Sequence, residues 1–316
     1  MNTVEFHSTY FITFIFTINI ALDFDQMRFG FHISIAGGFS KVIKRALDKQ
    51  CQCIQFFSRN PRGWVYKPLD TTDVTAFTAA VSRTTIHPIF IHMPYLPNLA
   101  SSDAKLWKRS VKELCADLKR AELLQVPYVI AHIGHSNDQA EKRACDRVSQ
   151  SIERAFESVP NTVRLLLENT AGQGTEIGYR LSHLQRIIAG SSHGDRLGVC
   201  LDVAHAFAAG YDVSTKRGFE ETLQEFDQCI GLGKLCLLHL NDSKARLGSR
   251  VDRHWHIGKG CIGIDGFRRI VNHSALRSLP GIMETPRKTD KEDLMNMKVI
   301  KSLMEKRGVG YKRKGQ

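Results

Sequence analysis

Two short apolar runs, GVCLDVAH at residues 198–205 and LCLLHLND at residues 235–242, indicate how this chain folds. Both are rich in Leu and Val. Neither alternates apolar with polar residues, which is typical of parallel strands that are buried on both faces. Both also carry histidine and aspartate towards their ends. The sequence therefore predicts a buried parallel sheet with reactive groups at the carboxyl ends of its strands.

Six further runs of the same kind occur along the chain: FGFHIS (29–34), CIQFF (53–57), PIFIHMP (88–94), YVIAHIG (128–134), RLLLENT (164–170) and PGIMET (280–285). Helical segments lie between them. Segment 101–124, for example, has apolar residues at spacings of three to five and begins with the helix-start sequence Ser-Ser-Asp. Eight strands alternating with helices over about 280 residues predict an α/β fold, a single (β/α)8 TIM barrel. An open doubly wound sheet is the alternative, but GQG (172–174) lacks the G-x-G-x-x-G spacing that its phosphate loop needs.

The two ends of the chain differ from the rest. We expect residues 28–307 to form the barrel domain, residues 1–27 to be an apolar extension outside the fold, and residues 308–316 to be a basic tail. The apolar run YFITFIFTINIAL (10–22) is too short to cross a bilayer. The preceding MNTVEFHST lacks the basic region of a signal peptide. We therefore expect no membrane association.

Charge and cysteine content restrict the function further. The chain has 44 Lys and Arg against 32 Asp and Glu, a formal net charge of +12, which favours a polyanionic partner such as nucleic acid. Its eight cysteines form no C-x-x-C pair, and most lie inside apolar runs. This pattern indicates reduced, buried thiols in a cytoplasmic protein, and it argues against disulfides or thiolate zinc sites.

Histidines and carboxylates gather at the ends of the predicted strands, where TIM barrels place their catalytic groups. They are His92, His132, Glu168, Asp202, His205, His239, Asp252, His254 and Glu284. One metal ion takes about four to six ligands, so nine candidates indicate a multinuclear site. Imidazole and carboxylate without thiolate favour Zn²⁺, with Mn²⁺ or Fe²⁺ as substitutes. Such a site activates water and holds both oxygens of a displacement at phosphorus, which predicts phosphoester hydrolysis.

At these residues the sequence resembles endonuclease IV, the zinc-dependent apurinic/apyrimidinic (AP) endonuclease family of base-excision repair. The resemblance runs from about Arg28 to about Lys306 and is carried by LLLENTAGQGTEIG (165–178), VCLDVAHAFAAGYD (199–212) and LHLNDSKARLGSRVDRHWHIGKGCIG (238–263). It implies a trinuclear zinc site at the C-terminal mouth of the barrel. His92 and His132 would hold one zinc, and Glu168 would bridge it to a second. Asp202, His239 and Glu284 would complete the second; His205, Asp252 and His254 would hold the third.

The resemblance also implies an activity and a partner. Zinc-bound hydroxide, positioned by the catalytic bridging residue Glu168, would hydrolyse double-stranded DNA on the 5′ side of an abasic site. The products would be a 3′-hydroxyl and a 5′-deoxyribose phosphate; family members also trim blocked 3′ ends. Arg62, Tyr95 and Leu96 match family positions on loops that enter the DNA, and Arg250 and Arg253 could contact phosphate. No nucleotide cofactor is implied, and a monomer suffices for one lesion.

Two other functions fit parts of the pattern. A metal-dependent sugar isomerase or epimerase of the same barrel type would use Glu168, Asp202, His239 and Glu284. It would leave the Asp252–His254 pair and the net charge of +12 unexplained. A non-catalytic DNA-binding protein with a structural metal would not need nine ligands. His32, at the end of the first predicted strand, is expected to contact ligands rather than a metal.

Overall fold

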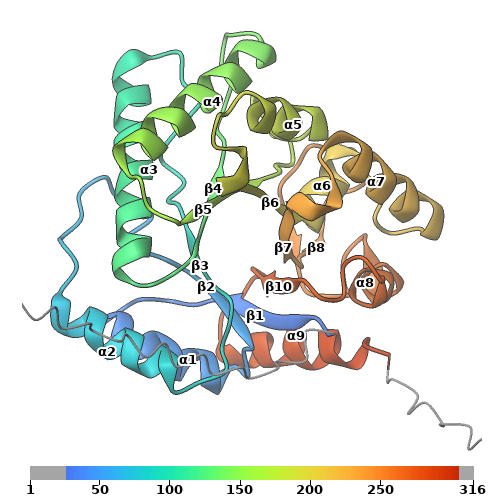
Figure 1. Ribbon diagram of the computed structural model, residues 1–316. Helices are drawn as coiled ribbons and strands as arrows, with labels where there is room; N and C mark the ends of the chain where they lie inside the picture. Colours follow the sequence, from blue (N-terminus) through green and yellow to red (C-terminus); the bar gives the residue numbers. More distant parts are fainter. Residues whose placement is uncertain (1–25, 306–316) are drawn as a thin grey trace, which may run out of the picture.

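Eight parallel strands close into a barrel in the order β1-β10-β7-β6-β5-β4-β3-β2, and helices surround it (Figure 1). The computed structural model describes residues 26–305; residues 1–25 and the predicted tail at 308–316 lie outside the described residues. The barrel strands are β1 (Arg28–His32), β2 (Cys53–Phe57), β3 (Ile89–His92), β4 (Tyr128–His132), β5 (Arg164–Glu168), β6 (Leu197–Asp202), β7 (Leu235–His239) and β10 (Pro280–Met283). All eight predicted strands and the TIM barrel are thus confirmed.

The helices follow the strands as a β/α barrel requires. They are α1 (Val42–Asp48), α2 (Thr71–Ser82), α3 (Ala104–Leu123), α4 (Glu141–Ser158), α5 (Leu181–Ala189), α6 (Val203–Ala209), α7 (Lys216–Cys229), α8 (Gly263–Asn272) and α9 (Asp290–Ser302). Short 3-10 turns lie at Phe39–Lys41, Gly194–Arg196 and Leu232–Lys234. Among residues 26–305, these helices are too short or too polar to cross a bilayer.

The start of α3 shows how the local sequence determines a helix. The Asp103 side chain accepts a hydrogen bond from the backbone N–H of Leu106 at 2.6 Å, which caps the helix. Leu114, Leu118 and Ala121 then lie on one face and are fully buried. Packing of that apolar face against the barrel holds the helix in place.

Two boundaries differ from the predictions. The sixth strand ends at Asp202 rather than at residue 205, because the Asp202 side chain accepts from His205 N–H at 2.8 Å and starts α6. His205 therefore lies in the first turn of a helix. At the amino end, Met27 was expected in the extension, but it is only 2% exposed and belongs to the core.

A layer of apolar side chains fills the barrel interior. It consists of Cys53, Phe90, Ile130, Leu166, Cys200, Leu237 and Ile282, all of them fully buried. On the remaining strand, β1, Gly30 leaves no room for a side chain, since a Cβ there would lie 1.6 Å from the carbonyl oxygen of Cys53. The barrel is thus a packed core, and polar groups can collect only beyond this layer.

Candidate metal centre

A second layer of eight side chains, one from each strand, lies directly above the apolar layer. Successive side chains of a strand point to opposite faces, so the residue two positions after each interior residue points into the barrel as well. These residues are His32, Gln55, His92, His132, Glu168, Asp202, His239 and Glu284. Six of the nine predicted metal ligands therefore come from a single layer at the C-terminal mouth.

The ligand atoms form three close groups: His92, His132 and Glu168; Glu168, Asp202, His239 and Glu284; and Asp202, His205 and His254. Within each group the atoms lie within 4.8 Å of one another. Glu168 and Asp202 each belong to two groups. Asp252 adjoins the last group, with carboxylate oxygens 3.4 Å from Nε2 of His205 and of His254. The structure thus brings all nine predicted side chains together.

Glu168 is one of two fully buried carboxylates in this cluster, and it depends on the histidines for its charge. Glu168 is fully buried, with Oε2 2.9 Å from His92 Nε2 and Oε1 3.0 Å from His239 Nδ1. Burial alone raises the pKa of Glu168, but His132 and His239 lower it well below its usual range. A buried carboxylate is stable when it is paired or binds a metal, so this site suits cations.

The histidine rings are oriented by hydrogen bonds on their outer nitrogens. Nδ1 of His92 lies 2.7 Å from the Met93 carbonyl, and Nδ1 of His205 lies 3.0 Å from the Asn169 carbonyl. When Nδ1 donates to a carbonyl, the lone pair of Nε2 remains to bind a proton or a metal ion. This is how metal-binding histidines are held in proteins.

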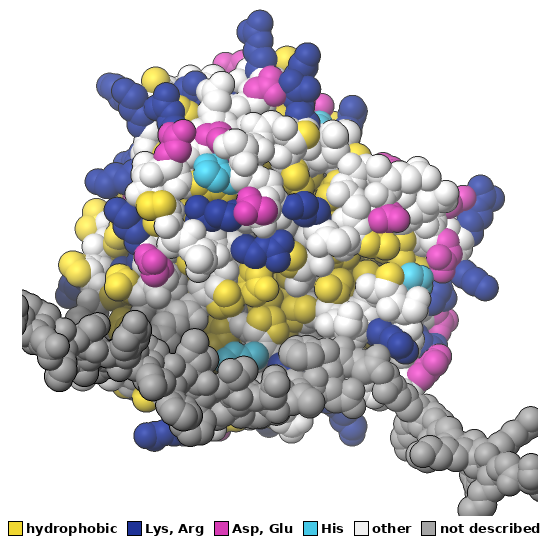
Figure 2. Space-filling view, viewed as in Figure 1, with side chains coloured by type: hydrophobic (Ala, Val, Ile, Leu, Met, Phe, Trp, Pro, Cys, Tyr) yellow, Lys and Arg dark blue, Asp and Glu magenta, His cyan; other side chains and the backbone are white. Residues whose placement is uncertain are grey.

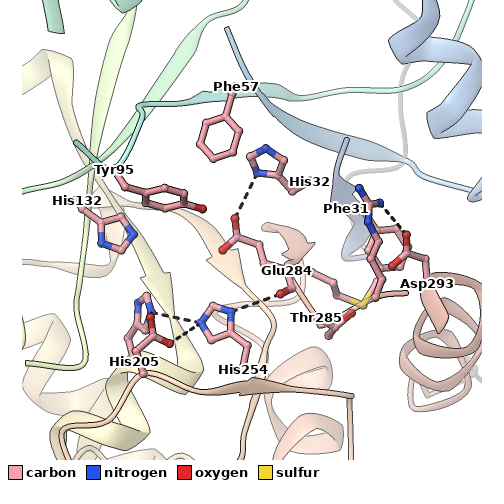
Figure 3. A pocket seen from close by; sticks show the side chains of 13 residues that line it. Phe31, His32, Phe57, Tyr95, His132, His205, His254, Glu284, Thr285 and Asp293 are labelled. Carbon is pink, nitrogen blue, oxygen red and sulfur yellow. Dashed lines mark hydrogen bonds and ion pairs between the residues drawn. The ribbon is translucent and has the colours of Figure 1, made fainter. Parts of the chain in front are cut away.

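Two ring nitrogens, one from His205 and one from His254, face each other. Nε2 of His205 lies 3.2 Å from Nε2 of His254 (Figure 3), and both nitrogens lie 3.4 Å from oxygens of the Asp252 carboxylate. Two neutral acceptors at this distance repel unless a proton or a metal ion binds between them. The donor set is nitrogen and oxygen without sulfur, which fits Zn²⁺ and also Mn²⁺ or Fe²⁺.

Buried anchors hold the loop that carries Asp252 and His254. This loop includes a small antiparallel pair, β8 (Asp242–Ser243) with β9 (His254–Trp255). The fully buried Asp242 carboxylate accepts from the backbone N–H groups of Ser243, Gly260 and Ile262 at 2.8, 2.9 and 3.0 Å. These bonds fix the two ends of the loop relative to each other.

The β5 loop supports the same segment from the other side. The Gln173 side chain accepts from the N–H of Asp252 at 3.1 Å, and the Arg250 guanidinium lies 4.3 Å from the centre of the Tyr179 ring. Gly172 packs against that ring, where a Cβ would lie 2.8 Å from Tyr179 Cγ. The GQG sequence therefore positions a loop of the metal centre, which its spacing alone did not reveal.

The cluster opens into a pocket of about 370 Å³, lined by His32, Phe57, Tyr95, His132, His205, Asp252, His254, Glu284, Thr285 and Arg287, among others. Tyr95 is 61% exposed, and its ring centre lies 5.4 Å from that of Phe57 and 6.1 Å from that of His132 (Figure 3). The neighbouring Leu96 is 39% exposed. Tyr95 therefore lies at the entrance of the pocket, and Leu96 is exposed beside it in the chain.

The three predicted DNA-contacting arginines are all exposed but differ in their surroundings. Arg62 follows β2, on a loop in which its own N–H donates to the Asn60 side chain. Arg250 is held against Tyr179, with a backbone φ of 53° in the left-handed region. Arg253 donates to the carbonyl of Asp252 at 2.8 Å. All three guanidinium groups are accessible to a ligand.

Comparison with known proteins identifies the family. The family model "Xylose isomerase-like TIM barrel" matches residues 43–303. A protein named probable endonuclease 4 from Methanoculleus marisnigri is 47% identical over 275 residues, covering 87% of this chain and 98% of that protein. A second, from Methanosphaerula palustris, is 43% identical and covers 88% and 98%. The chain belongs to the endonuclease IV family.

Solved structures give the same family and a wider fold group. The crystal structure of endonuclease IV from Thermus thermophilus is 36% identical, with a TM-score of 0.79, covering 87% of this chain and 98% of that one. A D-tagatose 3-epimerase-like protein, 17% identical with a TM-score of 0.68, covers 88% and 97% and shares the fold. The identity to endonuclease IV is thus about twice that to the epimerase-like barrel.

Several residues that shape this endonuclease IV site were not predicted. Gln55 lies in the ligand layer, where its side chain hydrogen-bonds His32, His239 and Glu284. A polar residue inside the buried run CIQFF, two positions after the interior residue Cys53, is the signal that could have found it. Asp242 and Gln173 act through tertiary contacts that no local pattern reveals.

Proposed function

We propose that this endonuclease IV family member cuts double-stranded DNA at abasic sites. It would hydrolyse the phosphodiester on the 5′ side of the site and leave a 3′-hydroxyl and a 5′-deoxyribose phosphate. The observation that carries the proposal is the convergence of nine histidine and carboxylate side chains in a family named for endonucleases. The same pocket would admit a blocked 3′ end, so we include 3′-end trimming in the proposal.

We propose that the site holds three Zn²⁺ ions, with Mn²⁺ or Fe²⁺ as substitutes. His92, His132 and Glu168 would hold one ion, and Glu168, Asp202, His239 and Glu284 a second. His205, Asp252 and His254 would hold the third, with Asp202 at its edge. Bound metal ions would lower the pKa of water and stabilise the attacking and leaving oxygens at phosphorus. Water supplies the oxygen added to phosphorus and the proton that the departing 3′-oxygen needs.

The protein contributes orientation to this chemistry. Glu168 lies at the centre of the ligand layer, with carboxylate oxygens 2.9 Å from His92 and 3.0 Å from His239, so it can belong to two metal groups at once. Gln55 and the Asn169 and Met93 carbonyls fix the rings of three histidines. Because these contacts are buried and already formed, binding of metal and substrate needs little rearrangement of the site.

Selection of the substrate would rest on shape. DNA that lacks one base is easier to bend, and its sugar is easier to rotate out of the helix, than intact DNA. Tyr95 at the pocket entrance and its neighbour Leu96 would wedge into the gap. Arg62 would fill the stack and meet phosphates, and Arg250 and Arg253 would contact phosphates. Basic side chains cover much of the periphery in Figure 2, in line with the net charge of +12.

We infer a cytoplasmic monomer. All eight cysteines are free thiols, which agrees with a reducing compartment. One lesion presents one phosphodiester to one pocket, so a single chain suffices. The sugar isomerase alternative would use one metal group and would leave the His205, Asp252 and His254 group without a purpose.

An incision assay tests the proposal. A duplex with one abasic site is incubated with the metal-loaded protein, and both product ends are mapped, before and after prolonged chelation. A cut 5′ to the site with a 3′-hydroxyl, lost on chelation, would support it. A 3′-unsaturated aldehyde would show lyase chemistry, and an intact duplex with fully loaded metal would favour the isomerase class.

A further inference from the structure

A second hollow, of about 630 Å³, adjoins the pocket of the metal centre. Its lining shares His32, Phe57 and Arg287 with that pocket. The other lining residues come from the ends of β1 and β2, residues 33–36 and 59–62. Strands β10, β1 and β2 are neighbours in the barrel, so this hollow extends the site across the end of β1.

The walls of the hollow are largely apolar, and its permanently charged side chains are arginines. Ile33, Ile35, Ala36 and Pro61 contribute apolar surface, and the described residues that line the hollow include no Asp or Glu. Arg62 and Arg287 come from the loops after β2 and β10, the two strands that flank β1. A DNA strand, which presents the C–H faces of its sugars between anionic phosphates, has the complementary chemistry.

The floor of the hollow is rigid. The Arg45 guanidinium donates to the carbonyls of Ser34 and Ala36 at 2.7 and 2.6 Å, and Ile33 N–H donates to the Gln55 carbonyl at 2.7 Å. The segment after β1 is therefore held from helix α1 and from strand β2. A ligand that binds against it does not have to order a loop, which favours affinity.

Arg287 is anchored so that it can bind an anion. Its Nη1 lies 3.0 Å from the Asp293 carboxylate, which is 2% exposed and also accepts from the buried Lys49 at 2.6 Å. Lys49 offsets the Asp293 charge; Asp290, its second partner, is 78% exposed and therefore screened by water. Arg287 itself keeps 36% of its side chain exposed, with further N–H donors available towards the hollow.

From this arrangement we propose that Arg287 binds a backbone phosphate next to the scissile one. The strand then crosses the hollow, with its deoxyribose against Ile35, Ala36 and Pro61 and its next phosphate towards Arg62. This assignment rests on the proposed function, since it takes abasic DNA as the substrate. It adds Arg287 to the DNA contacts and defines which surface the cut strand follows.

Neutral phosphates provide the test. Duplexes with one abasic site carry a single uncharged methylphosphonate at each position flanking the scissile phosphate, and kcat and KM for incision are measured. The proteins are the zinc-loaded wild type, Arg287→Gln, Arg287→Lys and the control Arg217→Gln. Arg217 suits a control because it is highly exposed on α7 and pairs with Glu221.

We expect Arg287→Gln to raise KM about tenfold on the native duplex with little change in kcat, as for loss of one charged hydrogen bond. Arg287→Lys restores part of this loss, because lysine keeps the charge but not the forked geometry. One methylphosphonate position costs the wild type about tenfold in kcat/KM and costs Arg287→Gln nothing further. Arg217→Gln behaves as the wild type.

Equal methylphosphonate penalties in the wild type and Arg287→Gln at every position would overturn the assignment. Zinc content and Tm are measured for every variant; if Arg287→Gln loses zinc, Arg287 acts through the metal centre, and the phosphate contact is wrong. A wild-type protein that leaves the native abasic duplex intact would instead overturn the proposed function and this inference with it.

Discussion

The side-chain oxygen of Gln55 lies 2.7 Å from Nε2 of His239, and its amide nitrogen lies 2.7 Å from a carboxylate oxygen of Glu284. One buried amide thus orients two proposed ligands of the same metal ion. We predict that Gln55→Leu, which keeps the side chain's bulk, weakens zinc binding about 10- to 100-fold, as loss of a hydrogen-bond partner of a metal ligand does. Competition with a chromophoric chelator measures the affinity.

Gln150→Leu is a matched control for this change. Gln150 is exposed on α4, so its substitution should leave zinc affinity as it is in the wild type. If Gln55→Leu binds zinc as tightly as the wild type, the amide does not orient the ligands.

Much of the barrel could be predicted because hydrophobic patterning and strand ends are local features. The runs that predict strands also place His92, His132 and Glu168 at their carboxyl ends. Because all strands of a TIM barrel run parallel, these ends meet at one mouth of the barrel. Leu166 and Glu168 are two residues apart and therefore point to the same face of β5. The same spacing from Cys53 on β2 predicts that Gln55 points into the site.

Other features depend on contacts that no local pattern contains. Asp242 holds backbone N–H groups eighteen and twenty residues away, and Arg287 is anchored through Lys49 from the other end of the chain. The helical position of His205 was missed because the apolar residues of α6 continue those of β6, and only the cap formed by Asp202 separates the two elements.

Glu168 belongs to two of the three ligand groups, so its charge matters more than its shape. We predict that Glu168→Gln keeps abasic-duplex binding but lowers the incision rate roughly a thousandfold, since metal stabilisation of the transition state supplies several kcal/mol. Single-turnover incision and fluorescence anisotropy measure the two effects separately. Incision at the wild-type rate would show that the proposed mechanism is wrong.

Zinc uptake should release protons. In the metal-free protein burial lowers the pKa of His205, but Asp202 and Asp252 raise it well above 6.5, so the ring is charged at pH 7. Zinc needs the lone pair that this proton occupies. We predict proton release on zinc addition at pH 7 and tighter zinc binding at pH 8 than at pH 6. A pH-indicator titration measures both, with zinc added to saturated protein as the blank; affinity that is independent of pH would contradict this.

Asp252 and His205 also make the stability of the metal-free protein depend on pH. Burial raises the pKa of Asp252, but His205 lowers it overall to about 2. Its contribution is present above the unfolded pKa of about 3.9 and is lost as pH falls towards 2. That of His205 is present below about 6.5 and is lost as pH rises through its raised folded pKa. The free energy of unfolding of the chelated protein, measured with denaturant, should therefore fall as pH drops towards 2 and also as pH rises through the folded pKa of His205.

Arg59 forms a buried ion-pair network with Glu113 and Asp117 beneath the loop that carries Arg62. Arg59→Met would leave two buried carboxylates without this partner, which costs about 3–5 kcal/mol. We predict a loss of that size in urea unfolding. Arg217→Met, at an exposed pair with Glu221, should leave the unfolding midpoint unchanged. Equal midpoints for the two variants would mean that the network is not stabilising.

Leu96 tests the wedge more cleanly than Tyr95, because the Tyr95 ring also packs against His92 and His132 and its loss would disturb the metal centre. A wedge acts only where a base is missing. Leu96→Ala should therefore weaken binding to an abasic duplex about tenfold, as for loss of one buried apolar contact, and leave binding to intact duplex and zinc content unchanged. Leu123→Ala is the control, since Leu123 is 60% exposed at the end of α3, away from the mouth. An equal loss of affinity for abasic and intact DNA would show that Leu96 contributes to non-specific DNA binding. No loss of affinity would show that Leu96 only packs within its loop.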